Sequence, residues 1–284
     1  AICEPADGSP SVVDEVAVEE PLEIRLAWRD PQSGDAREQS ISITMRTPGN
    51  DRELAIGFLH GEGIVTHPAQ VEVAEHCGPP VGPHQLRNVL KVTLADASQL
   101  DLKRLERHFY TTSSCGVCGK TSLEALRVQT HHTIAPSPVP TTLDVLGGLP
   151  TALRRHQAVF GRTGGIHASA LFDRHGKIHA VREDVGRHNA LDKLLGSAFM
   201  QGRLPLSESG VLVSGRASFE LMQKAVMAGV GMLAAVGAPS SLAVELAREF
   251  GVVLVGFLRD DRFNVYAGGE RSTDAGGAVR AASD

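Results

Sequence analysis

Several features that would assign a protein to a common class are absent from this 284-residue sequence or scarce in it. Its four cysteines are too few and too unevenly spaced for the disulfide framework of a secreted domain. Its net charge of −5 lacks the basic excess of a general nucleic-acid-binding protein. Its most apolar long run, residues 225–244, is broken by glycines and by Pro239, so we expect no contact with a membrane. The N-terminus lacks the basic and then apolar pattern of a signal peptide, and we therefore expect a cytoplasmic protein.

What the sequence does contain divides into two regions with α and β patterns. Hydrophobic residues make up 42% of the chain, which is enough for a normal core. Three prolines within residues 131–140 separate the two regions. We expect a loose acidic lead-in over residues 1–20, an α+β domain over 21–130, a layered α/β domain over 141–268 and a disordered tail over 269–284.

The first region is expected to begin with a β-hairpin. Apolar and polar residues alternate over 22–28 and 41–45, and Pro, Ser and Gly lie between these runs. Asn50 or Asp51 is placed to cap a helix that Gly61 ends. A further strand is expected over 89–94, and helices over 100–109 and 120–128.

The second region alternates between strand and helix patterns. This alternation predicts an α/β layered sheet. The expected strands cover residues 165–172, 178–181, 211–213, 232–236, 252–257 and 264–267, and the expected helices cover 189–200, 218–228 and 240–250.

Residues 111–120 contain two of the four cysteines, Cys115 and Cys118. Glycines in this segment let the backbone turn tightly and bring the two sulfur atoms together. Basic residues before the segment, Lys120 after it and the start of the predicted helix that follows all favour the thiolate. The thiolate is the reactive form of cysteine, so we predict that this loop carries the chemistry.

Three kinds of chemistry suit this cysteine pair. A zinc site would need two more ligands, for which His76, Cys77 and His108 are the candidates. A redox pair of the thioredoxin type belongs in an early β-α unit, whereas this pair follows a predicted helix. A sulfur carrier would accept a sulfur atom on one thiolate as a persulfide, and the second thiolate would assist. The residues alone leave these three possibilities open.

A glycine pair, Gly164 and Gly165, precedes a predicted strand that contains His167. Glycines at such a place permit close approach of a ligand to the backbone, although a tight turn explains them equally well. Zinc-dependent base deaminases have a glutamate two residues after a histidine ligand, but Ser169 stands there in this chain. Deaminase chemistry is therefore not expected.

Gly186, Arg187 and His188 directly precede a predicted helix, within the highly charged run 182–193. The N-terminus of a helix presents free backbone N–H groups, and cationic side chains beside it add to the attraction of an anion. We favour an anion or phosphate site here over a helix start that is merely solvated.

Two further segments follow predicted strands at their carboxyl ends, where ligands bind in open α/β sheets. The first comprises Ser214, Gly215 and Arg216. The second is a turn whose two arginines flank two carboxylates, a set that could hold a phosphate and the donor groups of a guanine ring; an ordinary charged turn is the alternative. The residues of this turn are Phe257, Leu258, Arg259, Asp260, Asp261 and Arg262.

These motifs, in their order along the chain, resemble the formate dehydrogenase accessory sulfurtransferase (FdhD) family from about residue 15 to residue 268. The cysteine loop at 114–119 and the run at 183–193 are the most specific parts of the resemblance. The other matching segments are 47–49, 57–59, 163–167, 214–216 and 256–259.

The resemblance implies a sulfur carrier that takes persulfide sulfur from a cysteine desulfurase. The acceptor would be molybdenum in the bis(molybdopterin guanine dinucleotide) cofactor that formate dehydrogenase needs for activity. By the same resemblance, Cys115 is the persulfide cysteine, Cys118 is its partner, and the turn at 257–262 contacts the cofactor. The protein would be a homodimer, and its C-terminal half would be similar to the cytidine deaminase fold. The alternative is a cofactor-binding chaperone whose cysteine pair is structural or binds zinc.

Overall fold

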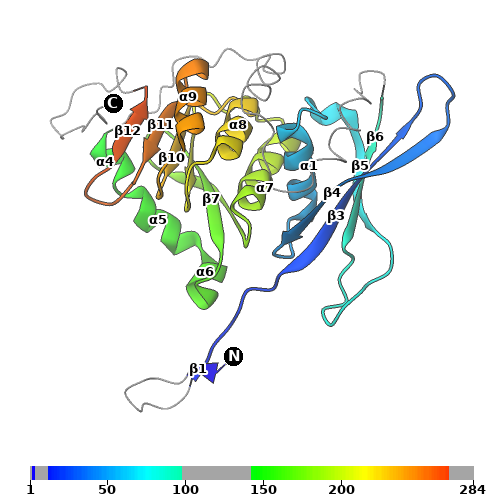
Figure 1. The fold of residues 1–284 in the computed structure, drawn as a ribbon, viewed down its shortest axis with the longest axis horizontal. Helices are drawn as coiled ribbons and strands as arrows, with labels where there is room; N and C mark the ends of the chain where they lie inside the picture. Colours follow the sequence, from blue (N-terminus) through cyan, green and yellow to red (C-terminus); the bar gives the residue numbers. More distant parts are fainter. Residues whose placement is uncertain (1, 4–11, 98–141, 269–284) are drawn as a thin grey trace.

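The computed structural model describes residues 2–3, 12–97 and 142–268, and it places one large sheet in each half of the chain (Figure 1). Near the N-terminus, β1 (Ile2–Cys3) and β2 (Val12–Val13) pair antiparallel. The cysteine loop, the predicted helices at 100–109 and 120–128 and the predicted tail lie outside the described residues. The predicted domain boundaries therefore stay a prediction.

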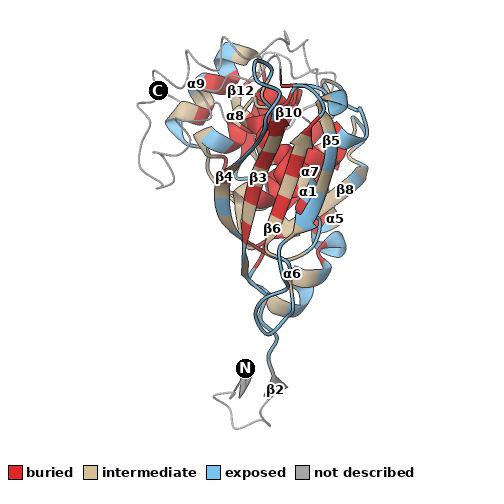
Figure 2. Ribbon diagram, turned by 90° about the vertical axis from the view of Figure 1, so that its right-hand side faces the viewer, coloured by how far each residue is buried: buried red, intermediate tan, exposed pale blue. Residues whose placement is uncertain are grey.

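The first sheet has four strands in the order β4-β3-β6-β5. The predicted hairpin is confirmed, because β3 (Glu20–Arg29) and β4 (Ala36–Arg46) pair antiparallel. The predicted strand β6 (Val89–Leu94) lies parallel to β3. Buried and half-buried residues alternate along β3 and β6, as expected for a sheet with one face on the core (Figure 2). The edge strand β5 (Val71–Cys77), preceded by the 3₁₀ helix η1 (Pro68–Gln70), was not predicted.

The inner face of this sheet is covered by α1 (Asp51–Gly61), the helix that the sequence predicts. Leu54, Ile56 and Leu59 of α1 pack with the buried leucine, isoleucine and valine side chains of β3 and β6. The predicted side-chain cap is wrong. Asn50 adopts a left-handed conformation without a capping hydrogen bond, and Asp51 forms a two-point ion pair with the buried Arg46. The Asp51 carboxylate therefore pairs with Arg46 at the end of β4 and does not cap the helix.

The second sheet has six strands in the order β12-β11-β10-β9-β7-β8, and all six were predicted. The central three strands are parallel to one another, whereas β7, β8 and β12 each lie antiparallel to their neighbours. Strand β8 runs three residues beyond the predicted end, as far as Asp184. The strands are β7 (His167–Phe172), β8 (Ile178–Asp184), β9 (Gly210–Val213), β10 (Met232–Ala235), β11 (Val253–Gly256) and β12 (Asn264–Ala267).

Helices cover both faces of the second sheet, which confirms the predicted α/β layering (Figure 1). One face packs against the three predicted helices, α7 (Arg187–Met200), α8 (Phe219–Met227) and α9 (Ser241–Phe250). Three short helices that were not predicted lie before β7. They are α4 (Leu143–Leu146), α5 (Leu149–His156) and α6 (Ala158–Thr163), and α4 and α5 pack on the opposite face. The expected similarity to the cytidine deaminase fold stays a prediction.

The two halves of the chain meet where α1 crosses α7 (Figure 1). A Cβ atom built on Gly57 of α1 would lie 1.9 Å from the backbone oxygen of Asp192 on α7. A Cβ atom built on Gly196 of α7 would lie 1.9 Å from the backbone oxygen of Glu53 on α1. Because neither glycine has room for a side chain, the two helix backbones are in direct contact.

Within the described part of the chain, no helix has both the length and the apolar composition needed to cross a membrane.

Candidate functional site

The sequence-predicted binding segments converge at one edge of the second sheet. The carboxyl ends of β9, β10 and β11 lie there because these strands are parallel, and the start of β7 lies there because β7 is antiparallel to β9. Backbone hydrogen bonds join the three loops that follow: Gly237 donates to Gly215 at 2.8 Å, and Phe257 donates to Gly237 at 3.0 Å. We call this region the sheet-edge site; its predicted residues are Gly164, Gly165, His167, Arg187, Ser214, Gly215, Arg216 and Phe257 to Arg262.

Arg187, Gly215 and His167 come together in the middle of the sheet-edge site. A Cβ atom built on Gly215 would lie 3.5 Å from the imidazole of His167 and 3.9 Å from Cδ of Arg187. The Nε atom of Arg187 is buried and has no hydrogen-bond partner within the described residues. A buried guanidinium N–H without an acceptor is costly, so this atom is ready to donate to a bound anion.

The imidazole of His167 is set to be neutral in this environment. Burial lowers the pKa of His167, and the positive charges of Arg187 and His188 lower it further, against an opposing effect of Asp184. A neutral imidazole can accept or donate a hydrogen bond without adding charge. The positive charge beside Gly215 therefore comes from Arg187.

Ser214 and Arg216 differ in how far they are available to a ligand. The Ser214 hydroxyl accepts a hydrogen bond from the backbone N–H of Ala168 at 2.9 Å, which ties the loop after β9 to β7. Arg216 is exposed at the start of the loop that leads into α8. The structure thus gives Ser214 a bond within the fold and leaves Arg216 at the surface.

The predicted turn at 257–262 contains both structural and exposed side chains. Leu258 is fully buried, and the Arg259 guanidinium donates to the carbonyl oxygens of Val236 at 2.7 Å and Leu258 at 2.8 Å. Asp260 accepts a hydrogen bond from Thr151, while Arg262 and Asp261 form an exposed pair. Phe257 has a positive φ of 51° and is 42% exposed. Holding a phenylalanine in this conformation costs energy, and the turn leaves its ring open to solvent.

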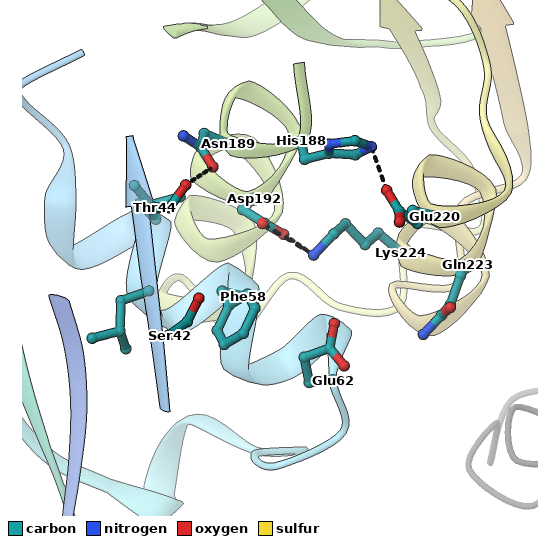
Figure 3. A pocket seen from close by; sticks show the side chains of 12 residues that line it. Ser42, Thr44, Phe58, Glu62, His188, Asn189, Asp192, Glu220, Gln223 and Lys224 are labelled. Carbon is teal, nitrogen blue, oxygen red and sulfur yellow. Dashed lines mark hydrogen bonds and ion pairs between the residues drawn. The ribbon is translucent and has the colours of Figure 1, made fainter. Parts of the chain in front are cut away.

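His188 faces a different region from Arg187, although the two residues are consecutive. Its Nε2 atom lies 2.7 Å from a carboxylate oxygen of Glu220 on α8 (Figure 3). The side chain lines a cavity between the helices, the interhelix pocket, which has a volume of about 280 Å³. Residues of β3, β4, α1, α7 and α8, and Glu62 directly after α1, line this pocket. They are Ile24, Ser42, Thr44, Leu54, Phe58, Glu62, His188, Asn189, Asp192, Glu220, Gln223 and Lys224.

The interhelix pocket contains a buried ion pair that sequence reasoning missed. The Lys224 ammonium lies 2.8 and 3.0 Å from the two carboxylate oxygens of Asp192 (Figure 3). Burial raises the pKa of Asp192 to about 6, although the charge of Lys224 acts in the opposite direction. The sequence pattern did not mark either residue as buried, because Asp192 stands in a highly charged run and Lys224 follows Glu220 by one helical turn.

Only some of the residues proposed as zinc ligands belong to the described part of the chain. Within the described residues, no group of three or more His, Cys, Asp or Glu side chains gathers as a metal site. His76 lies 3.3 Å from the Asp51 carboxylate, and Cys77 is a half-buried free thiol. Cys115, Cys118 and His108 lie outside the described residues.

The fold and the sheet-edge site define a two-sheet α/β protein with a candidate anion site at the carboxyl ends of parallel strands. The chain belongs to the FdhD/NarQ family, whose model matches residues 17–273, so the family resemblance of the motifs is confirmed.

Similar proteins include several that are named sulfur carrier protein FdhD. The protein from Streptomyces coelicolor is 52% identical over 268 residues, which cover 93% of this chain and 92% of that protein. The protein from Mycobacterium tuberculosis is 50% identical over 262 residues, which cover 91% of both chains. A crystal structure from Desulfotalea psychrophila, described as a candidate formate dehydrogenase accessory protein, has a TM-score of 0.68 at 23% identity and covers 96% of this chain and 97% of its own. That likeness shows a shared fold.

Proposed function

We propose that this protein is a sulfur carrier with sulfurtransferase activity that serves a formate dehydrogenase. The observation that carries the proposal is identity of about half of all residues, over about nine-tenths of the chain, to proteins named sulfur carriers. The sequence contains the dithiol that such chemistry needs, Cys115 and Cys118. We further propose that it acts in the cytoplasm as a homodimer.

Sulfur loading takes place on Cys115 in this proposal. The Cys115 thiolate attacks the outer sulfur of a persulfide on a cysteine desulfurase. A new S–S bond forms on Cys115, the S–S bond of the desulfurase breaks, and the electron pair leaves with the desulfurase thiolate. No external oxidant or reductant is needed, because one persulfide replaces another.

Sulfur release uses Cys118. Its thiolate attacks the Sγ atom of Cys115, the persulfide bond breaks, and the terminal sulfur leaves with the electron pair as hydrosulfide. The Cys115–Cys118 disulfide that results is reduced by a cellular dithiol before the next cycle. The acceptor is the molybdenum of bis(molybdopterin guanine dinucleotide), which is a substrate of the carrier.

The sheet-edge site is the proposed binding place for the acceptor. A guanine dinucleotide carries phosphates, and the Nε atom of Arg187, which has no hydrogen-bond partner among the residues that the structure describes, supports an anion beside Gly215 and His167. The exposed ring of Phe257 offers a flat apolar surface for a base. Gly164, Gly165 and the exposed Arg216 and Arg262 border the same edge.

Mass spectrometry tests the carrier role. The purified protein is incubated with a cysteine desulfurase and cysteine, and its intact mass is measured before peptide mapping. We expect one added sulfur atom on Cys115, removable by a reductant, and no added sulfur in Cys115→Ala. Cys118→Ala should accept sulfur but fail to release it as hydrosulfide. Full loading of Cys115→Ala, or a stoichiometric zinc ion in the untreated protein, would favour the chaperone alternative.

A further inference from the structure

Asp184, at the end of β8, is a buried carboxylate with four donors around it. Its side chain is 0% exposed, and that of its ion-pair partner Lys193 is 1% exposed. One carboxylate oxygen accepts from the backbone N–H of Gly186 at 2.9 Å and from the Asn189 amide at 3.0 Å. The other oxygen accepts from the backbone N–H of Thr47 at 3.1 Å and lies 2.7 Å from the Lys193 ammonium. The carboxylate is saturated and cannot contact a ligand itself.

These bonds belong to a closed network that joins the two halves of the chain. The Lys193 ammonium also donates to the carbonyl oxygen of Thr47 at 2.8 Å, and the Thr47 hydroxyl accepts from the backbone N–H of Val185 at 3.1 Å. The Asn189 amide donates to the carbonyl oxygen of Met45 at 2.7 Å. Segments about 140 residues apart in sequence are therefore fixed to one another at the start of α7.

The network surrounds the backbone that carries Arg187. Asp184 holds the N–H of Gly186, Thr47 holds the N–H of Val185, and Asn189 lies 3.0 Å from a Cβ atom built on Gly186. The start of α7 has no side-chain cap of its own, so these contacts set its direction. A buried ion pair is weak evidence for a stabilising role, because the cost of desolvation can exceed the Coulombic attraction.

We propose that Asp184 is a positioning residue for the sheet-edge site. It fixes the backbone at 185–187 so that the Arg187 guanidinium lies beside Gly215 and His167, and a nucleotide phosphate is bound by Arg187 and not by Asp184. This inference rests on the proposed nucleotide-binding role of the sheet edge. In this proposal, the ion pair of Asp184 with Lys193 helps to position a binding residue, whereas the ion pair of Asp192 with Lys224 does not.

The second ion pair supplies a matched control. Asp192 and Lys224 are also buried and lie 2.8 Å apart, but they do not contact the backbone at 185–187. Asp184→Asn keeps the side-chain shape but turns one acceptor into a donor, so two of the four donors lose their partner. Asp192→Asn makes the same chemical change beside Lys224.

The experiment measures guanosine diphosphate binding to both variants by titration calorimetry. We expect Asp184→Asn to weaken binding by about tenfold and Asp192→Asn to leave it within about twofold, as is usual when a group that orients a binding residue is lost. Thr47→Val, which removes only the acceptor for Val185, should weaken binding about threefold and keeps the test usable if Asp184→Asn does not fold. Equal affinity losses in the two Asn variants, or no loss in Asp184→Asn and Thr47→Val, would overturn the positioning role.

Hydrogen exchange of the ligand-free proteins separates this inference from the function it rests on. Asp184→Asn and Thr47→Val should speed exchange at the amides of residues 185–187, and Asp192→Asn should not. If the unaltered protein does not bind guanosine diphosphate, the proposed acceptor site is wrong. In that case, equal exchange rates at residues 185–187 in all three variants would also refute the proposal that Asp184 fixes this backbone. Faster exchange in Asp184→Asn and Thr47→Val than in Asp192→Asn would support it.

Discussion

The sheet-edge site and the interhelix pocket share the first turn of α7 but differ in how their polar groups are satisfied. Arg187 points into the sheet-edge site with a buried N–H that lacks an acceptor in the described residues. His188, the next residue, is paired with Glu220, and Asp192 is paired with Lys224 (Figure 3). The polar groups of the interhelix pocket are therefore paired with one another, whereas the sheet-edge site has a buried N–H donor without an acceptor among the described residues. We expect substitutions in the sheet-edge site to weaken ligand binding and substitutions in the interhelix pocket to lower the free energy of unfolding.

The largest effect on stability is expected at the backbone contact between α1 and α7, two of the helices that line the interhelix pocket. Gly57→Val should lower the free energy of unfolding by about 3 kcal/mol, because a side chain there collides with the backbone of Asp192. Urea denaturation measures this change. Gly161→Ala is the control: no neighbour in the described part of the chain lies within 4 Å of a Cβ atom at that helical position, and this change should stabilise by about 0.5 kcal/mol. A Gly57→Val protein as stable as the parent would contradict the direct backbone contact.

The pH dependence of stability tests the ion pair in the pocket. Burial raises the pKa of Asp192 from 3.8 to about 6, so the folded state favours the protonated carboxyl. This contribution is complete below pH 3.8 and is lost as the pH rises to about 6. Relative to the double variant Asp192→Asn with Lys224→Met, the parent should lose about 3 kcal/mol over that range. Parallel stability curves for the two proteins would show that Asp192 does not titrate there.

Arg187 and His188 give the most direct test of the difference between the two regions. Arg187→Ala should weaken guanosine diphosphate binding by about 10- to 100-fold, since a charged hydrogen bond contributes about 1.5–3 kcal/mol. The free energy of unfolding should change by less than about 1 kcal/mol, because the Arg187 Nε atom has no hydrogen-bond partner within the described residues that the variant would leave unsatisfied. His188→Ala should leave binding within about twofold, because its partner is Glu220. A large loss of binding in His188→Ala would place both residues in one site.

The smallest effect concerns Ser169, whose buried hydroxyl has no hydrogen-bond partner within the described residues. Ser169 is on the same strand as His167, two residues further along β7. Ser169→Ala should change the free energy of unfolding by less than about 1 kcal/mol, in the stabilising direction, because it removes an unsatisfied polar atom. Thermal denaturation measures this. Weakened nucleotide binding in this variant would instead assign the hydroxyl to the sheet-edge site.

Much of the fold could be predicted because its strands and long helices have regular patterns. The hairpin of β3 and β4 and all six strands of the second sheet follow from alternation and from short apolar runs. Strand β5 escaped prediction because Glu72, Glu75 and His76 interrupt its apolar pattern on an exposed edge. Helices α4 to α6 have only four to eight residues each, too short for a helical period to stand out.

The sheet-edge site was predictable for a topological reason. Parallel strands bring their carboxyl ends together, so the segments after β9 and β11 had to lie near one another. The sequence could not show that Arg187 and His188 face different regions, because this depends on the packing of α8 beside α7. The interhelix pocket was missed for the same reason: its residues come from β3, β4, α1, α7 and α8. Contacts over long sequence distances leave no local pattern.

The glycine contact between α1 and α7 also affects whether the two halves of the chain can be produced as separate fragments. Phe199 of α7 completes the core cluster of the first sheet, so each half supplies surface that the other half needs covered. A fragment that ends at residue 97, or one that begins at residue 142, would expose a bare strip of helix backbone together with apolar side chains. We expect neither fragment to be obtained in soluble form by itself, while co-expression of complementary fragments should restore the paired helices.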